Sequence, residues 1–270
     1  MGFVAPKYDS KSTEFFRTLK QRTDNYFKRN GLDKQGGLGM YLKTLFMITA
    51  YLTPYFFILF GDIQNLWVYS GLSVLMGIFM SGIGLSIMHD AIHGSYSKNK
   101  RVNLMLGEII NLVGGASINW KIQHNVLHHT YTNVEEFDED IEGPSFLRFS
   151  PHSKRLRIHK FQFLYAWFFY GLLTLNWAVF ADFDSLIRYK KRGLIRTSSK
   201  YSFGFHLFKL IAFRAAYFGY MIVIPICVTD HSLISILLNF LLMHWVAGFI
   251  LSCIFQPAHV MESSTYSSVE

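Results

Sequence analysis

Long apolar runs separated by short polar links dominate this chain. Four of them approach the roughly 20 residues that an α-helix needs to cross a bilayer; they cover about residues 42–60, 66–88, 210–228 and 233–255. The links at 61–65 and 229–232 are short, so each pair of runs predicts an antiparallel helical hairpin. The pattern predicts an all-α integral membrane protein with four transmembrane helices arranged as two hairpins.

Two further apolar runs do not fit a simple crossing. The run 104–118 is short and is interrupted by Glu108 and Asn111, so we expect a buried or interfacial segment. The run 161–181 is long enough to cross, but the basic residues that follow it, from Arg188 to Arg196, would then lie on the side that excludes positive charge. We therefore expect an interfacial or half-buried helix.

The positive charges define an orientation. Of the 26 lysines and arginines, nine lie up to Lys43, sixteen lie from Lys98 through Lys209, and one is Arg214. The links 61–65 and 229–232 carry none. The positive-inside rule then predicts that the N-terminus, the region 89–209 and His259 are cytoplasmic. The chain is 51% hydrophobic, and its net charge of +8 is explained by basic residues on one side of the membrane. We therefore expect no nucleic-acid partner.

The chain divides into three parts by composition. Residues 1–40 form a polar, basic N-terminal arm, in which 13–29 predict an amphipathic helix, either on the membrane surface or simply solvated. Residues 41–262 form the membrane domain, and 263–270 are a polar tail. Cys227 and Cys253 lie inside apolar runs, which gives neither a disulfide framework nor a cysteine metal site.

Histidines are the candidate metal-binding residues. Five of the eleven lie in two tight groups, His89 with His93, and His124 with His128 and His129. Positions i and i+4 of a helix share one face, so each group presents a pair of imidazoles. Neutral imidazole binds iron, zinc, copper or nickel, and this pattern predicts a transition-metal site without selecting the metal.

A zinc protease is the alternative that the spacing His89-x-x-x-His93 raises, with Asp90 where the H-E-x-x-H motif has glutamate. That interpretation leaves the second histidine group unexplained. The predicted topology instead returns His259, after the last apolar run, to the same face as both groups.

The stretches MHDAIHGSYS, WKIQHNVLHHTYTN and FQPAHVMES resemble the membrane fatty acid desaturases, above all microbial front-end and acyl-lipid enzymes, over roughly residues 40–262. The resemblance implies four transmembrane helices under a cytoplasmic cap and a histidine-ligated di-iron centre. His89 and His93 then correspond to the first histidine box, His124, His128 and His129 to the second, and His259 to an extra ligand. The family's third box, H/Q-x-x-H-H, is not found up to Glu270, so we expect an incomplete centre with substoichiometric iron.

The implied reaction is O₂-dependent desaturation of a fatty acyl chain, with two iron ions as cofactors and O₂ as co-substrate. The implied partners are an acyl-lipid or acyl-CoA substrate, membrane lipid, and a separate electron donor, cytochrome b5 or ferredoxin. A membrane di-iron hydroxylase or other oxygenase, and an inactive truncated fragment, are the alternatives.

Roles for the neighbouring residues remain open at this stage. Asp90 either accepts a hydrogen bond from a ligand imidazole or is a helix-end charge, and Asn125 either orients a ligand or caps a turn. We expect the acidic stretch 135–142 to be a solvated loop, although Asp138 and Asp140 are close enough in sequence to the histidines to support metal ligands. We expect Trp120 and Trp177 to anchor helices at the membrane interface rather than to line a substrate tunnel.

Overall fold

The computed structural model describes residues 13–195 and 202–268. Residues 1–12 of the basic arm, Arg196 and Lys200, and the last two residues of the polar tail lie outside the described residues. The regular elements of the described residues are all helices, and Val134 and Ser267 form one isolated bridge. Its elements are α1 (Thr13–Arg29), α2 (Leu38–Phe60), α3 (Leu66–Ile83), η2 (Gly84–Met88), α4 (His89–Ile92), α5 (Lys100–Gly107), η3 (Ile109–Val113), α6 (Ser117–Trp120), η4 (Lys121–His128), η5 (Arg157–Phe161), α7 (Gln162–Gly171), α8 (Leu173–Asn176), η6 (Trp177–Ala181), α9 (Asp182–Lys191), α10 (Phe203–Phe218), η7 (Gly219–Val223), α11 (Ile224–Val228) and α12 (Leu233–His259).

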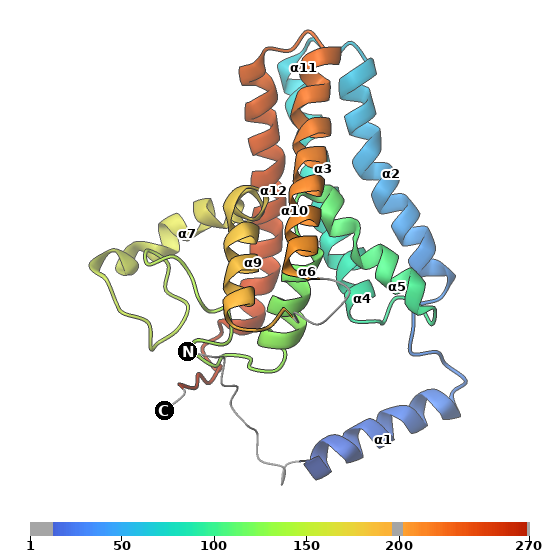
Figure 1. Ribbon diagram of the computed structural model, residues 1–270, viewed down its shortest axis with the longest axis vertical. Helices are drawn as coiled ribbons and strands as arrows, with labels where there is room; N and C mark the ends of the chain where they lie inside the picture. The colour runs from blue at the N-terminus through green and yellow to red at the C-terminus, as the bar shows by residue number, and fades with distance from the viewer. Residues whose placement is uncertain (1–12, 196–201, 269–270) are drawn as a thin grey trace.

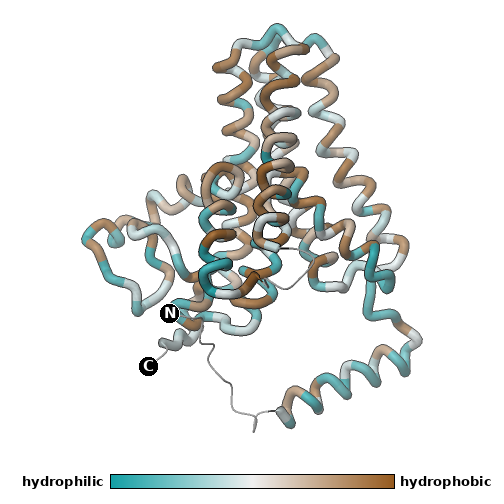
Figure 2. Tube along the Cα trace, in the orientation of Figure 1, coloured by the Kyte–Doolittle hydropathy of each residue, from teal (hydrophilic) through white to brown (hydrophobic). Residues whose placement is uncertain are grey.

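Four continuous helical stretches of the described chain are long and apolar enough to cross a membrane, which confirms the predicted number. They are Leu38–Phe60, Leu66–Ile92, Phe203–Val228 and Leu233–His259. They stand side by side as a bundle, with apolar residues along most of their length, and the shorter helices gather at one end (Figures 1 and 2). The protein is therefore an integral membrane protein whose connecting segments are concentrated on one face.

Side-chain caps start a spanning helix at each hairpin. The Asn65 side chain accepts hydrogen bonds from the backbone N–H groups of Trp67 and Val68 at the start of α3. The Ser232 hydroxyl accepts one from Ser235 N–H at the start of α12. Such caps satisfy backbone donors that have no partner within the helix. Both hairpin links lie at the end of the bundle away from α4 and α6 (Figure 1).

Small residues bring the helices into close contact. A Cβ atom added at Gly77 of α3 would lie 2.5 Å from the Met243 carbonyl oxygen of α12. One added at Gly248 of α12 would lie 2.6 Å from the Gly171 carbonyl oxygen at the end of α7. Glycine lets backbones approach this closely, and in lipid such packing is a principal source of helix association. These contacts fix α12 against both the bundle and the shorter helices.

The two doubtful apolar runs form broken helices. Residues 104–118 pass through α5, the 3₁₀ segment η3 and the start of α6, and none of these is long enough to span. The run 161–181 lies in two helical stretches, Arg157–Gly171 and Leu173–Lys191, which meet at 53°. Phe163 and Trp167 on α7 are exposed, and α7 projects sideways from the bundle near its histidine end (Figure 1). This geometry agrees with an interfacial helix.

Candidate metal centre

The first histidine pair lies at the end of the second spanning helix. The π-helical turn η2 continues α3 into α4, which carries His89 and leads to His93. Their ring centroids are 4.6 Å apart, as expected for i and i+4. Gly94 follows with φ of +71°, a conformation that glycine adopts without strain and that ends the helix.

The second histidine group lies on a π-helix, which differs from the α-helical spacing expected from the sequence. In η4 the backbone N–H of His129 donates to the His124 carbonyl at 3.0 Å, a bond from residue i+5 to residue i. The side chains of residues five apart therefore lie on the same face of the helix, and the Nε2 atoms of His124 and His129 are 3.1 Å apart. The His128 ring instead stacks on that of His124, with centroids 5.4 Å apart. Single π-turns of this kind occur frequently at functional sites.

The two groups converge on one another. The Nε2 atom of His93 lies 3.3 Å from that of His129, and the rings of His89 and His124 have centroids 5.1 Å apart. A transition metal bound at about 2.1 Å by imidazole nitrogens sets neighbouring ligand nitrogens roughly 3.0–3.4 Å apart. The observed nitrogen spacings match that requirement, so these residues fit a transition-metal ion.

His259 joins the cluster from the end of α12. Its ring centroid is 4.2 Å from that of His128, and its backbone carbonyl accepts a 3.3 Å hydrogen bond from the Asn133 side chain. A second set of potential ligand atoms, from His124, His128 and Asp140, lies within 4.8 Å of one another, next to the set from His89, His93 and His124. The six histidines predicted from the sequence therefore lie together, with room for more than one ion.

We expected the acidic stretch 135–142 to be a solvated loop. The structure shows instead that Asp138, within this stretch, is fully buried. One carboxylate oxygen lies 2.8 Å from His128 Nδ1, and the other accepts the Asn133 backbone N–H at 2.7 Å. Asp140 lies behind it, with an oxygen 3.3 Å from the same His128 nitrogen and a hydrogen bond from Gln123. A carboxylate that accepts the Nδ1–H of an imidazole fixes its tautomer and leaves Nε2 for a metal.

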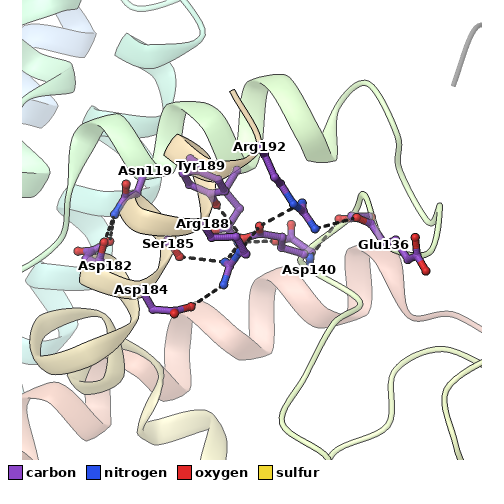
Figure 3. Close-up of polar contacts among 12 residues, drawn as sticks. Asn119, Glu136, Asp140, Asp182, Asp184, Ser185, Arg188, Tyr189 and Arg192 are labelled. Carbon is purple, nitrogen blue, oxygen red and sulfur yellow. Dashed lines mark hydrogen bonds and ion pairs between the residues drawn. The ribbon is translucent and has the colours of Figure 1, made fainter. Parts of the chain in front are cut away.

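Helix α9 holds this loop in place (Figure 3). Arg188 donates two hydrogen bonds to the Glu139 carboxylate, at 2.9 and 3.2 Å, and the Tyr189 hydroxyl donates a third at 2.7 Å. Arg192 donates to the Glu136 carbonyl at 3.3 Å. From the polar tail, Ser267 pairs with the backbone of Asn133 and Glu135. The loop that positions Asp138 is thus attached on two sides.

The cluster favours neutral imidazole, the form that binds metal. Burial and the charges of the neighbouring histidines lower the pKa of His124 to about 2. Partial burial and the charges on His89 and His129 lower the pKa of His93 to about 4. For His128, burial also lowers the pKa, but the hydrogen bond that His128 donates to Asp138 and the charge of Asp140 outweigh burial and raise the pKa.

The other residues singled out in the sequence have the following places. Asp90 lies 3.6 Å from His89 Nδ1, longer than a hydrogen bond, and 3.4 Å from the Lys43 ammonium. Asn125 donates a 3.3 Å hydrogen bond to the Ile92 carbonyl and so links the two histidine segments. Trp120 is not an interfacial anchor: it is buried, with its ring centroid 4.1 Å from that of His124.

A cavity of about 810 Å³ opens beside His124. Its walls come from the acidic loop, from α7 to α9 and from α12, with Phe169, Leu172 and Leu173 among the apolar residues. A narrower, mostly apolar pocket lies next to it and shares Trp120, Trp177 and Phe255 with it. The cavity therefore has polar groups of the loop and His124 in its wall, and the neighbouring pocket has mostly apolar side chains of the bundle.

Comparison with known proteins identifies the class. The family model described as fatty acid desaturase matches residues 64–267. The chain is 31% identical over 265 residues to an acyl-lipid (8-3)-desaturase of Physcomitrium patens, covering 97% of this chain and 54% of that protein. It is 30% identical over 253 residues to an sn-1 linoleoyl-lipid 6-desaturase of Synechocystis sp., covering 93% of this chain and 69% of that protein.

A probable Delta(5) fatty acid desaturase C of Dictyostelium discoideum is 31% identical over 258 residues, which is 94% of this chain and 54% of that protein. No solved structure matches the chain. The protein belongs to the fatty acid desaturase family, and it spans between about half and two thirds of the length of these relatives.

Proposed function

We propose that this protein acts in O₂-dependent desaturation of a fatty acyl chain carried on a membrane lipid. The observation that carries the proposal is the convergence of six histidines at one end of a membrane bundle, beside a cavity that leads into apolar space. The relatives whose printed names include acyl-lipid or linoleoyl-lipid support a lipid-bound substrate.

The residues of the site would have different roles, as metal ligands, as groups that orient a ligand, and as walls for the acyl chain. His89, His93, His124, His128, His129 and His259 would contribute ligands to two iron ions, with Asp138 orienting His128. When bound, the irons would supply the oxidising power, from O₂ and two external electrons, that removes hydrogen from an unactivated methylene. Trp120 and Trp177 line the path beside His124 and would fix the acyl chain there, while apolar walls exclude water.

The site would lie on the cytoplasmic side. Lysines and arginines are concentrated in the segments at the histidine end, and none lies in the links at the opposite end. The positive-inside rule therefore supports a cytoplasmic metal centre and N-terminus. A separate cytoplasmic electron donor, cytochrome b5 or ferredoxin, would then reach it from water.

The test is product analysis in a host that provides such a donor. Expression of the chain extended by the C-terminal segment of a desaturase relative should add a double bond to phospholipid acyl chains, detected by mass spectrometry of the intact lipids and of their fatty acids. His124→Ala should abolish the product and leave membrane insertion unchanged, whereas exposed His152→Ala should retain it. A hydroxylated product would instead identify an oxygenase, and zinc without lipid products would reject the proposal.

A further inference from the structure

Helix α1 presents an apolar stripe that nothing in the described protein covers. No residue of α1 is buried, and Phe15, Phe16 and Tyr26 are 76%, 68% and 59% exposed. At 100° per residue, the side chains of Phe15, Tyr26, Leu19, Phe16 and Phe27 fall within an arc of about 120°. Figure 2 shows the resulting alternation of apolar and polar residues along this helix. Phe15, Phe16, Leu19 and Tyr26 are exposed and Phe27 is half-buried, so the stripe carries a large apolar area.

Basic residues flank the stripe. Lys20 lies just beyond one edge, and Arg22 and Arg29 lie just beyond the other. Arg17 and Lys28 lie on the opposite side, so α1 carries five basic residues against two acidic ones, Glu14 and Asp24, a net charge of +3. Long cationic side chains beside an apolar stripe can keep their charges at the lipid headgroups while the stripe enters the acyl region.

The connection to α2 keeps α1 near the membrane. Only residues 30–37 separate the two helices, and eight residues reach at most about 28 Å. The link is held at its far end, because Gly36 N–H donates to the Ser95 carbonyl at 3.1 Å and Lys98 pairs with Asp33 at 2.6 Å. An ion pair between Lys34 and Asp24 attaches α1 itself to the link. The first residues of α2, Leu38 and Leu42, are exposed apolar side chains at the membrane boundary.

We propose that α1 lies in the plane of the membrane, on the face that carries the metal centre, and binds anionic phospholipid. The stripe buries in the headgroup–acyl boundary, and the flanking lysines and arginines pair with lipid phosphates. Two features select an anionic lipid surface as the occupant: the excess of positive charge on α1 and the short link to a spanning helix. The inference does not depend on the proposed enzymatic activity.

Spin labels on opposite faces of α1 test this in the full chain, after replacement of Cys227 and Cys253. Leu19→Cys and Gln21→Cys are two residues and about 200° apart, which makes them a matched pair. In vesicles of phosphatidylcholine with phosphatidylglycerol, the label at 19 should collide with O₂ and be protected from a water-soluble nickel chelate. The label at 21 should show the reverse. Equal access of the chelate to both labels would overturn the proposal.

Charge variants test the lipid preference. Lys20→Gln, Arg22→Gln and Arg29→Gln together should weaken docking of α1 on anionic vesicles by about fivefold for each residue. The matched control neutralises three exposed basic residues of a loop, Lys154, Arg155 and Arg157, and should leave docking unchanged. Equal protection at residue 19 in pure phosphatidylcholine would contradict anionic selectivity. Protection in native membranes but not in vesicles would show a protein partner and also contradict the proposal.

Discussion

At the scale of residues, the six histidines lie together, and buried neighbours such as Asp138 and Trp120 contact them. Asp138 is one of several acidic residues in a polar stretch, and only the fold shows that it is buried beside His128. Trp120 illustrates the same limit, because an aromatic residue at the end of an apolar run is equally suited to the interface and to the core. Burial and partners are properties of long-range packing, which a local pattern does not contain.

Asp138→Asn should weaken metal binding about 10–100-fold, because the amide no longer stabilises the Nδ1–H tautomer of His128. Metal affinity can be measured by competition with a chelator, which needs no turnover. Asp184→Asn is the control, since Asp184 is mostly exposed and pairs only with Arg188 of its own helix. Unchanged affinity in the Asp138 variant would reject its positioning role.

Acidification should destabilise the metal-free protein. The folded-state pKa values of His93, about 4, and His124, about 2, lie below the ordinary 6.5, so the unfolded chain binds more protons below pH 6.5. The stabilising contribution of His128, whose pKa is raised, is already complete below 6.5 and does not offset this loss. The melting temperature in detergent should therefore fall from pH 6.5 to 4.5, and less steeply in His124→Asn. A flat profile would contradict the assigned environments.

At the scale of elements, apolar length predicted the spanning helices, because crossing a bilayer imposes a minimum number of residues. The pattern did not predict the π-helical turns η2 and η4, which change the alignment of the histidines by one residue. A π-turn adds one residue to the helix without changing the residue types that favour helix.

The close contact of α3 with α12 gives a matched test within one helix. Gly77→Ala should destabilise the protein by about 1–3 kcal/mol, because its Cβ would lie 2.5 Å from the Met243 carbonyl oxygen. Gly71→Ala, on the same helix with nothing within 4 Å, should be neutral or stabilising. Thermal unfolding in detergent measures both changes. Equal effects of the two substitutions would mean that the helices do not approach as described.

At the scale of the whole molecule, hydrophobic length and charge placement predicted four crossings with the histidines at one end. The arrangement of the shorter helices around the cavity required the structure, because the bend of 53° between Arg157–Gly171 and Leu173–Lys191 has no marker in an apolar run. Phe169 and Trp177, one from each of these two helical stretches, both line the cavity beside His124.

The proposed orientation can be tested in intact cells. With Cys227 and Cys253 replaced, a cysteine at exposed Lys191 should be protected from an impermeant thiol reagent, and one at exposed Asp230 should react. The reason is that basic residues surround the first position and none lies in the second link. Labelling at 191 as efficient as at 230 would reject the four-crossing topology with a cytoplasmic metal centre.

The central claim is that both histidine groups and His259 build one metal centre. Iron content and iron X-ray absorption of the purified chain test it most directly. The account predicts iron bound by imidazole nitrogens at about 2.1 Å, with the signal reduced alike by His93→Ala, His124→Ala and His259→Ala and unchanged by His152→Ala. Full iron binding with the same nitrogen shell in His124→Ala would contradict it, because His124 is shared by both sets of ligand atoms.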